Sequence, residues 1–347
     1  MKAVNFKLGE HPNNESIFSI WLKSEDDLRR ENLHRKLVEI ELNNEIITQI
    51  AEWIKKHHIS EKQFKLSEKK KNILKKYGLV KFIENQKYLP NNDNTKKGNL
   101  GEIILCEYLE EITDNKLLIY RLRYNPNVDQ SMKGDDILLF NLDNIKDKIL
   151  LGEAKFRIPA TKSTVEEILQ SFGGKPKLPL SLTFISNILR DDGKDDLADE
   201  IEELQVEMKD GKIPVINIGF IMGNNNTYNS IDKHHLYGDF KITKETIKAL
   251  ERENDFPIDA LKPLINKTYK TETALYKAIN AELNKKDLPS LTSSDKERLF
   301  NFTQKKINPH LVFISLSSNS PNTILKNSYK EAYKLIKIYL ENECSKS

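Results

Sequence analysis

The hydrophobic residues of this chain recur in two patterns that predict helices and strands in alternation. Over residues 98–109, hydrophobic residues recur at steps of three and four, which is typical of an amphipathic helix. Short apolar runs, typical of buried strands, follow at 117–124, 137–140, 149–157, 213–222 and 310–316. Further helices are predicted at 161–172, 178–189, 244–254, 271–283 and 329–340. This order predicts an α/β (α+β) fold in which a mixed central sheet is flanked by helices.

The first 92 residues follow a different pattern and are predicted to form an N-terminal appendage of short strands and helices. Strands are expected at 4–6, 17–22 and 38–42, and a helix is expected around residues 46–54. The polar stretch 91–97 has the composition of a loop, so we place a domain boundary there. Residues 1–92 then form the appendage, and residues 93–347 form the main domain.

Segment 62–81 carries eight lysines against one acidic residue, with apolar residues between them. One interpretation is a basic helix that lies along a nucleic-acid backbone. The residues contacting DNA would then be Lys69, Lys70, Lys71 and Lys75. The alternative is a lysine-rich helix face exposed to solvent, which is the common outcome for a charge run. Segment 191–203, with eight acidic residues, predicts a solvated helix face or, alternatively, a docking surface for a basic partner.

Composition excludes several classes of protein. A chain of 347 residues that is 38% hydrophobic and 31% charged can bury a core and is not a disordered sequence. Its net charge of +3 permits a nucleic-acid partner without requiring one. The two cysteines, Cys106 and Cys344, are too distant to indicate a disulfide framework or a cysteine-rich metal site. No signal peptide or membrane-spanning run is present, so a cytoplasmic protein without a membrane partner is expected.

Two of the predicted strands carry charged residues where a buried strand should be apolar. Asp136 stands at the head of one strand, and Glu153 and Lys155 interrupt the next, separated by Ala154. Because alternate residues of a strand share a face, Glu153 and Lys155 point the same way. Burying a carboxylate and an ammonium group is unfavourable unless they are paired or bind an ion. The set is therefore a candidate catalytic site, and the alternative is a structural cluster of ion pairs.

These residue types suit metal-assisted hydrolysis of a phosphodiester, which requires neutralised phosphate oxygens and a deprotonated water. Mg²⁺, or Mn²⁺ in its place, binds one or two carboxylates and keeps several waters. The predicted metal ligands are Asp136, Glu153 and the backbone carbonyl of Ala154. Lys155, on the Glu153 face, would position or deprotonate the attacking water.

Glu102 is a fourth candidate catalytic residue, and Asp135 and Gln170 are candidates for accessory roles. Glu102, on the predicted helix 98–109, would add a metal ligand or orient a metal-bound water. The alternative for Glu102 is an ordinary first-turn acid that interacts with the helix dipole. Asp135 is the direct neighbour of Asp136, and Gln170 is the polar residue of helix 161–172 best placed to reach the site. The pair His234-His235 lacks a third ligand nearby in sequence, so a metal site there is not favoured.

Asp136, followed seventeen residues later by Glu153-Ala154-Lys155, resembles the motif of the PD-(D/E)xK nuclease superfamily. Gly134-Asp135-Asp136 stands where the usual Pro-Asp would be, and Asp136 is preferred because two apolar residues follow it directly, as in that family. A longer set of residues is similar to HamA, the family of nuclease-like subunits in the bacterial Hachiman anti-phage system. That set lies at 97–102, 123–126, 133–136 and 152–155. The resemblance covers residues 93–320 and is clearest over 97–172.

The resemblance implies a metal-dependent DNA nuclease with a restriction-endonuclease-like core. It also implies a superfamily 2 helicase partner, HamB-like, whose DNA-dependent release frees the nuclease. It does not account for residues 1–92. The alternatives are a non-catalytic subunit that binds DNA or a partner, a family member that has lost cleavage, and a stand-alone restriction endonuclease. The sequence leaves open the DNA form, endonuclease or exonuclease action, activity without the partner and a homo-oligomer.

Overall fold

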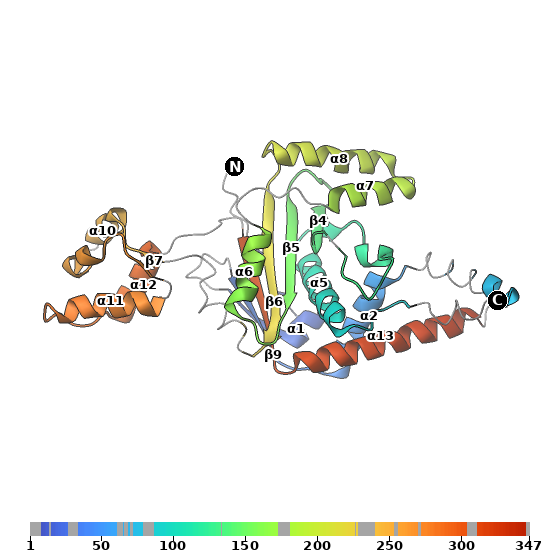
Figure 1. Ribbon diagram of the computed structural model, residues 1–347, viewed down its shortest axis with the longest axis horizontal. Helices are drawn as coiled ribbons and strands as arrows, with labels where there is room; N and C mark the ends of the chain where they lie inside the picture. The colour runs from blue at the N-terminus through green and yellow to red at the C-terminus, as the bar shows by residue number, and fades with distance from the viewer. Residues whose placement is uncertain are drawn as a thin grey trace.

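A seven-stranded mixed sheet forms the centre of the protein in a computed structural model (Figure 1), as the strand pattern predicted. Its strand order is β1-β2-β9-β6-β5-β4-β3. The strands are β1 (Leu22–Asp26), β2 (His34–Glu39), β3 (Asn115–Leu117), β4 (Ile137–Asn141), β5 (Ile149–Phe156), β6 (Val215–Asn224) and β9 (Leu311–Ser318). Strands β2, β9, β6 and β5 run parallel, whereas β1, β4 and β3 are antiparallel to their neighbours.

The structure describes residues 8–344, with gaps. The gaps are 14, 27–33, 61–64, 66–68, 70–71, 79–86, 133, 173–180, 226, 228–239, 253–255, 270–271 and 304–310. The expected strand at 4–6, two of the predicted DNA-contacting lysines (Lys70 and Lys71) and the pair His234-His235 therefore lie outside the described residues.

Helices cover both faces of the sheet and bury two separate apolar layers. One layer packs the helices α2 (Asn44–His58), α5 (Asp93–Ile112) and α13 (Pro321–Cys344) against the strands. The other layer packs α6 (Lys162–Ser171), α7 (Ser181–Asp191) and α8 (Asp195–Lys209) against the opposite face. Each predicted helix in these layers is present, although α13 begins earlier than residue 329. The sheet with a helix layer on each face confirms the expected fold class at this level.

The expected strand at 17–22 is wrong, because most of it is the short helix α1 (Ile17–Trp21). The Ser16 side chain accepts a hydrogen bond from the Phe18 N–H and so caps a helix start where an apolar run suggested a strand. Strand β1 begins only at Leu22. Strand β2 begins at His34, four residues before the predicted start.

The polar stretch 91–97 is largely helical rather than a loop. The Asn92 side chain accepts a hydrogen bond from the Asn94 N–H, and α5 begins at Asp93. On the N-terminal side of this stretch, β2 pairs with β9 inside the central sheet, with Leu37 opposite Leu316. Phe18 and Trp21 share the apolar layer of α5. The division into units 1–92 and 93–347 stays a prediction.

The expected strand at 117–124 is also largely wrong. Strand β3 ends at Leu117, and residues Arg121–Tyr124 form the 3₁₀ helix η2. Two arginines hold this segment away from the sheet edge. Arg121 binds Glu102 of α5, and Arg123 donates hydrogen bonds of 3.0 and 2.7 Å to the Lys56 carbonyl of α2. Side-chain anchoring therefore overrides the apolar pattern here.

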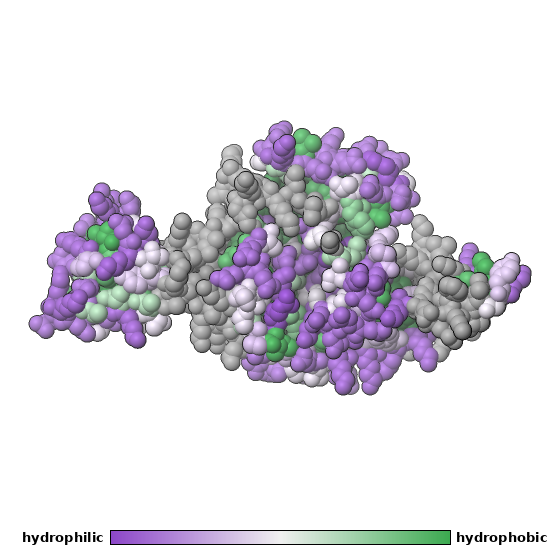
Figure 2. Space-filling view, viewed as in Figure 1, coloured by the Kyte–Doolittle hydropathy of each residue, from purple (hydrophilic) through white to green (hydrophobic). Residues whose placement is uncertain are grey.

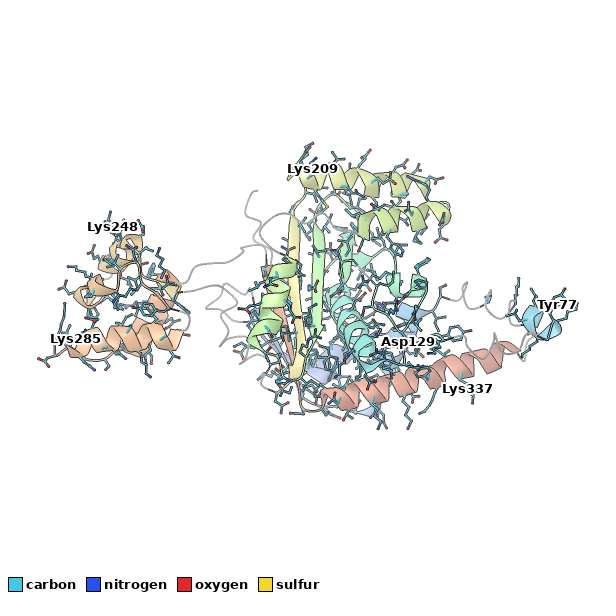
Figure 3. The ribbon with its side chains drawn as sticks, viewed as in Figure 1. Tyr77, Asp129, Lys209, Lys248, Lys285 and Lys337 are labelled. Atoms are coloured by element: carbon cyan, nitrogen blue, oxygen red, sulfur yellow. The ribbon has the colours of Figure 1, made fainter. Side chains whose placement is uncertain are left out.

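Between β6 and β9, the chain forms a small module with its own apolar core, which the sequence did not predict. Its elements are β7 (Phe240–Lys241), α10 (Lys244–Glu251), η3 (Ile258–Ala260), η4 (Lys262–Leu264), β8 (Thr268–Tyr269), α11 (Glu272–Asn284) and α12 (Ser293–Thr303). The predicted helices at 244–254 and 271–283 correspond to α10 and α11. Lys248 and Lys285 lie on its outer surface (Figure 3).

The acidic segment 191–203 runs into α8, whose outer residues are exposed, as expected for a solvated helix face. Figure 2 shows that the outward side of the α7–α8 pair is mostly hydrophilic.

Of the lysine-rich segment, residues 65, 69 and 72–76 are helical, and Lys69 and Lys75 are exposed. None of the helices that the structure describes has the length and apolar character that a membrane span needs.

Candidate active site

Strands β4 and β5 bring Asp136 next to the Glu153 segment. Ile137, the first residue of β4, lies opposite Gly152, so Asp136 is at the level of Glu153. The Asp136 Oδ2 atom accepts a hydrogen bond of 2.8 Å from the Ala154 N–H. This bond holds the Asp136 carboxylate, which directly precedes β4, against the backbone of β5.

Glu153 and Lys155 share one face of β5, as the alternation of strand residues predicted. Lys155 Nζ lies 2.6 Å from Glu153 Oε1, and the two side chains are 21% and 15% exposed. Ala154 points the other way and joins the apolar layer beneath α5. The structure therefore brings three predicted site residues, Asp136, Glu153 and Lys155, to one end of the β4–β5 pair.

Glu102 approaches this end of the sheet from the other face, on α5. A Cβ atom at Gly101 would lie 3.7 Å from the Cβ of Ala154, so the α5 backbone passes close to β5 beside Glu102. Both carboxylate oxygens of Glu102 accept hydrogen bonds from Arg121, at 2.8 Å from Nε and 2.9 Å from Nη2. Glu102 is thus held as the partner of an arginine, a contact that the sequence did not predict.

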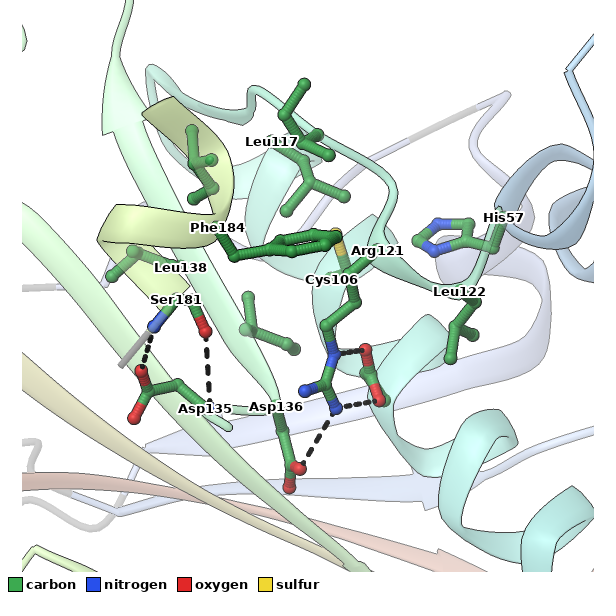
Figure 4. Close-up of a pocket in the computed structure, with 14 residues that line it drawn as sticks. His57, Cys106, Leu117, Arg121, Leu122, Asp135, Asp136, Leu138, Ser181 and Phe184 are labelled. Atoms are coloured by element: carbon green, nitrogen blue, oxygen red, sulfur yellow. Dashed lines mark hydrogen bonds and ion pairs between the residues drawn. The ribbon is translucent and has the colours of Figure 1, made fainter. Parts of the chain in front are cut away.

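Arg121 is the site residue that the sequence reasoning missed. Besides Glu102, its Nη2 atom lies 3.4 Å from Asp136 Oδ1, so one guanidinium contacts two carboxylates (Figure 4). Its side chain is 13% exposed. A charged residue inside the apolar run 117–124 is the same signal that singled out Glu153 and Lys155. That signal could have identified Arg121.

Burial and neighbouring carboxylates raise the pKa of Asp136 to about 7, far above its ordinary value of 3.8. Removal from water is the largest cause, followed by repulsion from Glu102 and Glu153. The Ala154 N–H and Arg121 act in the opposite direction by stabilising the charged form. Keeping Asp136 ionised at neutral pH therefore has an energetic cost in the protein without a bound cation.

Replacing Asp136 by asparagine is expected to stabilise the metal-free protein at pH 8 by about 2 kcal/mol, since one pKa unit corresponds to 1.36 kcal/mol. The expected gain in the free energy of unfolding is smaller than the full pKa shift would give, because the variant also loses the ion pair with Arg121. The folded-state pKa lies above the unfolded value. The wild type therefore loses stability as pH rises from about 4 to about 7, and D136N does not. Denaturant unfolding in EDTA at pH 5 and pH 8 measures the difference.

Asp129→Asn is the matched control, because hydrogen bonds from Lys87 and the Asn91 N–H lower the pKa of Asp129. Asp129 lies on the surface (Figure 3). Its substitution by asparagine should give no stability gain at pH 8. D136N should exceed the wild type in stability by more at pH 8 than at pH 5. An equal difference at the two pH values would contradict the assigned environment of Asp136.

The donor set suits a small, hard cation held by two carboxylates. Asp136 and Glu153 are oxygen donors at one strand end, and Mg²⁺ typically takes one or two carboxylates and keeps its waters. The Ala154 N–H faces Asp136, and the N–H and C=O of one strand residue point to the same side. The Ala154 carbonyl is therefore on the Asp136 side. Within the described part of the chain, no set of three or more His, Cys, Asp and Glu side chains is arranged as a metal site.

The remaining candidate residues lie apart from this group. Asp135 is buried, and its carboxylate accepts a hydrogen bond of 3.2 Å from the Ser181 N–H at the start of α7 (Figure 4). Asp135 therefore joins β4 to α7 rather than facing β5. Gln170 is exposed on α6. Tyr77, just beyond the described lysine-rich helix, is 71% exposed (Figure 3), so that helix contributes to the surface and not to this site.

Comparison with known proteins identifies the family. The sequence model of the HamA family matches residues 15–344. The chain belongs to the HamA family. A relative from Bacillus cereus, the Hachiman protein HamA, is 42% identical over 217 residues, which cover 62% of this chain and 78% of the relative. Membership in the HamA family makes this chain a protein of the Hachiman anti-phage defence system, as the sequence resemblance indicated.

The HamA match begins at residue 15 and therefore includes α1, β1, β2 and α2. The resemblance noted in the sequence began only at residue 93. In this chain, the N-terminal strands β1 and β2 belong to the central sheet, where β2 pairs with β9.

Proposed function

We propose that this HamA-family protein is a metal-dependent DNA nuclease that hydrolyses phosphodiester bonds during phage defence. The observation that supports this most strongly is the grouping of Asp136, Glu153 and Lys155 at one end of two paired strands. Two carboxylates and an ammonium group at a strand end are the groups that metal-assisted hydrolysis of a phosphodiester requires.

The order of elements around the site supports a restriction-endonuclease-like core. Helix α5 precedes β3, β4 and β5, and α6 leads on through α7 and α8 to β6, which pairs with β5. The elements thus follow the order helix, three strands, helices and strand. The residues that resemble the PD-(D/E)xK motif lie on the second and third of these strands. The rest of the sheet and the small module are additions to that core.

Each residue then has a defined task. Asp136, Glu153 and the Ala154 carbonyl would hold Mg²⁺ or Mn²⁺. The bound ion supplies charge neutralisation at the phosphate and lowers the pKa of water. Lys155 donates to Glu153 and holds that carboxylate in position, and its ammonium group lies where it can orient the attacking water. The Ala154 N–H holds the Asp136 carboxylate in a single orientation.

DNA and a helicase are the proposed partners. Lys69 and Lys75 are exposed on a described helix, where they can contact a phosphate backbone. The superfamily 2 helicase that the HamA resemblance implied would control access of DNA to the nuclease. This regulation lies outside the chain.

The test is incubation of plasmid DNA with Mg²⁺ and the purified protein, with and without the product of the neighbouring gene. The double variant Glu153→Ala/Lys155→Ala is expected to lose DNA cleavage under both conditions. The matched control is Asp259→Ala/Lys262→Ala, which removes an exposed ion pair of the same 2.6 Å separation from the small module. The control should cleave as wild type does.

Cleavage that persists in the Glu153/Lys155 variant would refute the site. A non-catalytic binding subunit is the second candidate, because Arg121 engages Glu102 and contacts Asp136. Equal phage protection by wild type and the double variant would favour that candidate.

A further inference from the structure

Both carboxylate oxygens of Asp136 already have a donor. Oδ2 accepts from the Ala154 N–H at 2.8 Å, and Oδ1 lies 3.4 Å from Arg121 Nη2. The longer contact is the weaker one. Glu102 holds the same guanidinium with two hydrogen bonds in the fork geometry that is specific to arginine. Arg121 is therefore fixed by Glu102 and reaches Asp136 from the α5 side.

The position of Arg121 is itself built into the fold. Two residues further on, Arg123 lies 4.1 Å from the centre of the Tyr120 ring and donates to the Lys56 carbonyl of α2. These contacts hold η2 against α2, and η2 directs Arg121 toward the carboxylates. The Nη1 atom of Arg121 is buried and has no hydrogen-bond acceptor among the described residues. Binding to Glu102 and Asp136 is thus what keeps this arginine in place.

We propose that Arg121 is an internal counter-cation that competes with the divalent metal for Asp136 and sets the metal affinity of the site. This inference rests on the proposed metal-dependent function. A guanidinium and a divalent cation repel each other, and both are attracted to the Asp136 Oδ1 atom. Metal binding therefore requires Arg121 to move away from Asp136 while Glu102 retains it. Arg121 is a positioning residue, since it acts on a metal ligand.

Calorimetric titration of the full-length protein with Mn²⁺ tests the competition without measuring cleavage. Arg121→Gln is expected to bind Mn²⁺ about tenfold more tightly than wild type, because the variant removes a positive charge that repels the cation and contacts the Asp136 Oδ1 atom. Arg190→Gln is the matched control, since it removes the same charge from a surface ion pair of the α7–α8 pair. It should leave the affinity within about twofold of wild type, because the Arg190 guanidinium pairs with Asp199 and Glu202 at the protein surface.

A second measurement uses the wild-type protein, so it does not depend on how well a variant folds. In protein carrying ¹⁵N-labelled arginine, the Nε–H signal of Arg121 should shift as Mg²⁺ is added, whereas that of Arg123 should not.

The outcomes separate this inference from the proposed function. Equal Mn²⁺ affinity of wild type and Arg121→Gln, or an unchanged Arg121 signal in Mg²⁺-bound protein, would overturn the inference and leave the metal site intact. Absence of Mn²⁺ binding in both proteins would refute the metal site, and the inference with it.

Discussion

Replacing Lys155 by methionine is expected to lower the rate of DNA hydrolysis about a thousandfold, within the range for losing a group that assists proton transfer. Methionine keeps the unbranched chain but removes the ammonium group that donates to Glu153 at 2.6 Å. The proposed metal ligands Asp136 and Glu153 remain. The loss should therefore appear in the single-turnover rate at saturating Mg²⁺ and persist when more metal is added.

Two further variants are compared with Lys155→Met: Glu153→Gln and the control Lys148→Met. Glu153→Gln removes a proposed ligand, so it should weaken Mn²⁺ binding as well as hydrolysis. Lys148 directly precedes β5 and pairs with Asp147 at 3.3 Å, and its replacement should leave the rate within about twofold of wild type, as expected for an exposed ion pair. A Lys155→Met protein that hydrolyses DNA at the wild-type rate would contradict this role, and a loss that excess Mg²⁺ restores would show that Lys155 serves only to position Glu153.

The local patterns of the sequence predicted the β4–β5 pair and its charged residues well, because a charge inside a buried strand has few explanations. Asp136 stood out at the head of an apolar run, Glu153 and Lys155 stood out by interrupting the next, and the structure brings the three together. Helix α5 and the strands β6 and β9 were equally clear, since long periodic or continuous apolar segments leave little ambiguity.

The sequence failed where a side chain decides the backbone conformation or where contacts are distant along the chain. The cap from Ser16 turned an apolar run into α1, and the anchoring of Arg121 and Arg123 turned another into η2. Pairing of β2 with β9 joins residues almost 280 positions apart, which no local pattern reveals. Arg121 carried a local signal, as a charged residue inside an apolar run, but its partner Glu102 lies on a different element and could not be read from that signal.

Replacing Trp21 by alanine is expected to destabilise the folded protein by about 4 kcal/mol, the usual loss for a large aromatic residue in a core. Trp21 is fully buried, stacks on Phe18 with ring centres 6.4 Å apart, and shares an apolar layer with α5 and β9. If that layer unfolds as one unit, the loss of stability should be the same for the first 92 residues and for residues 93–347. Tyr77→Ala, at a 71% exposed side chain, should change the stability by less than about 0.5 kcal/mol.

Two probes distinguish one unit from two. The chain contains two tryptophans, so in Trp21→Ala the fluorescence of Trp53 alone reports on α2. The buried thiol of Cys106 reports on α5 through its labelling during denaturant pulses, in a background where Cys344 is replaced by serine. Because Trp53 and Cys106 lie in the same apolar layer, both midpoints should fall together. A Trp53 transition that moves to lower denaturant while Cys106 labelling stays at the wild-type midpoint would instead establish residues 1–92 as a separate unit. The N-terminal strands would then be dispensable for holding Glu102 against the β4–β5 pair.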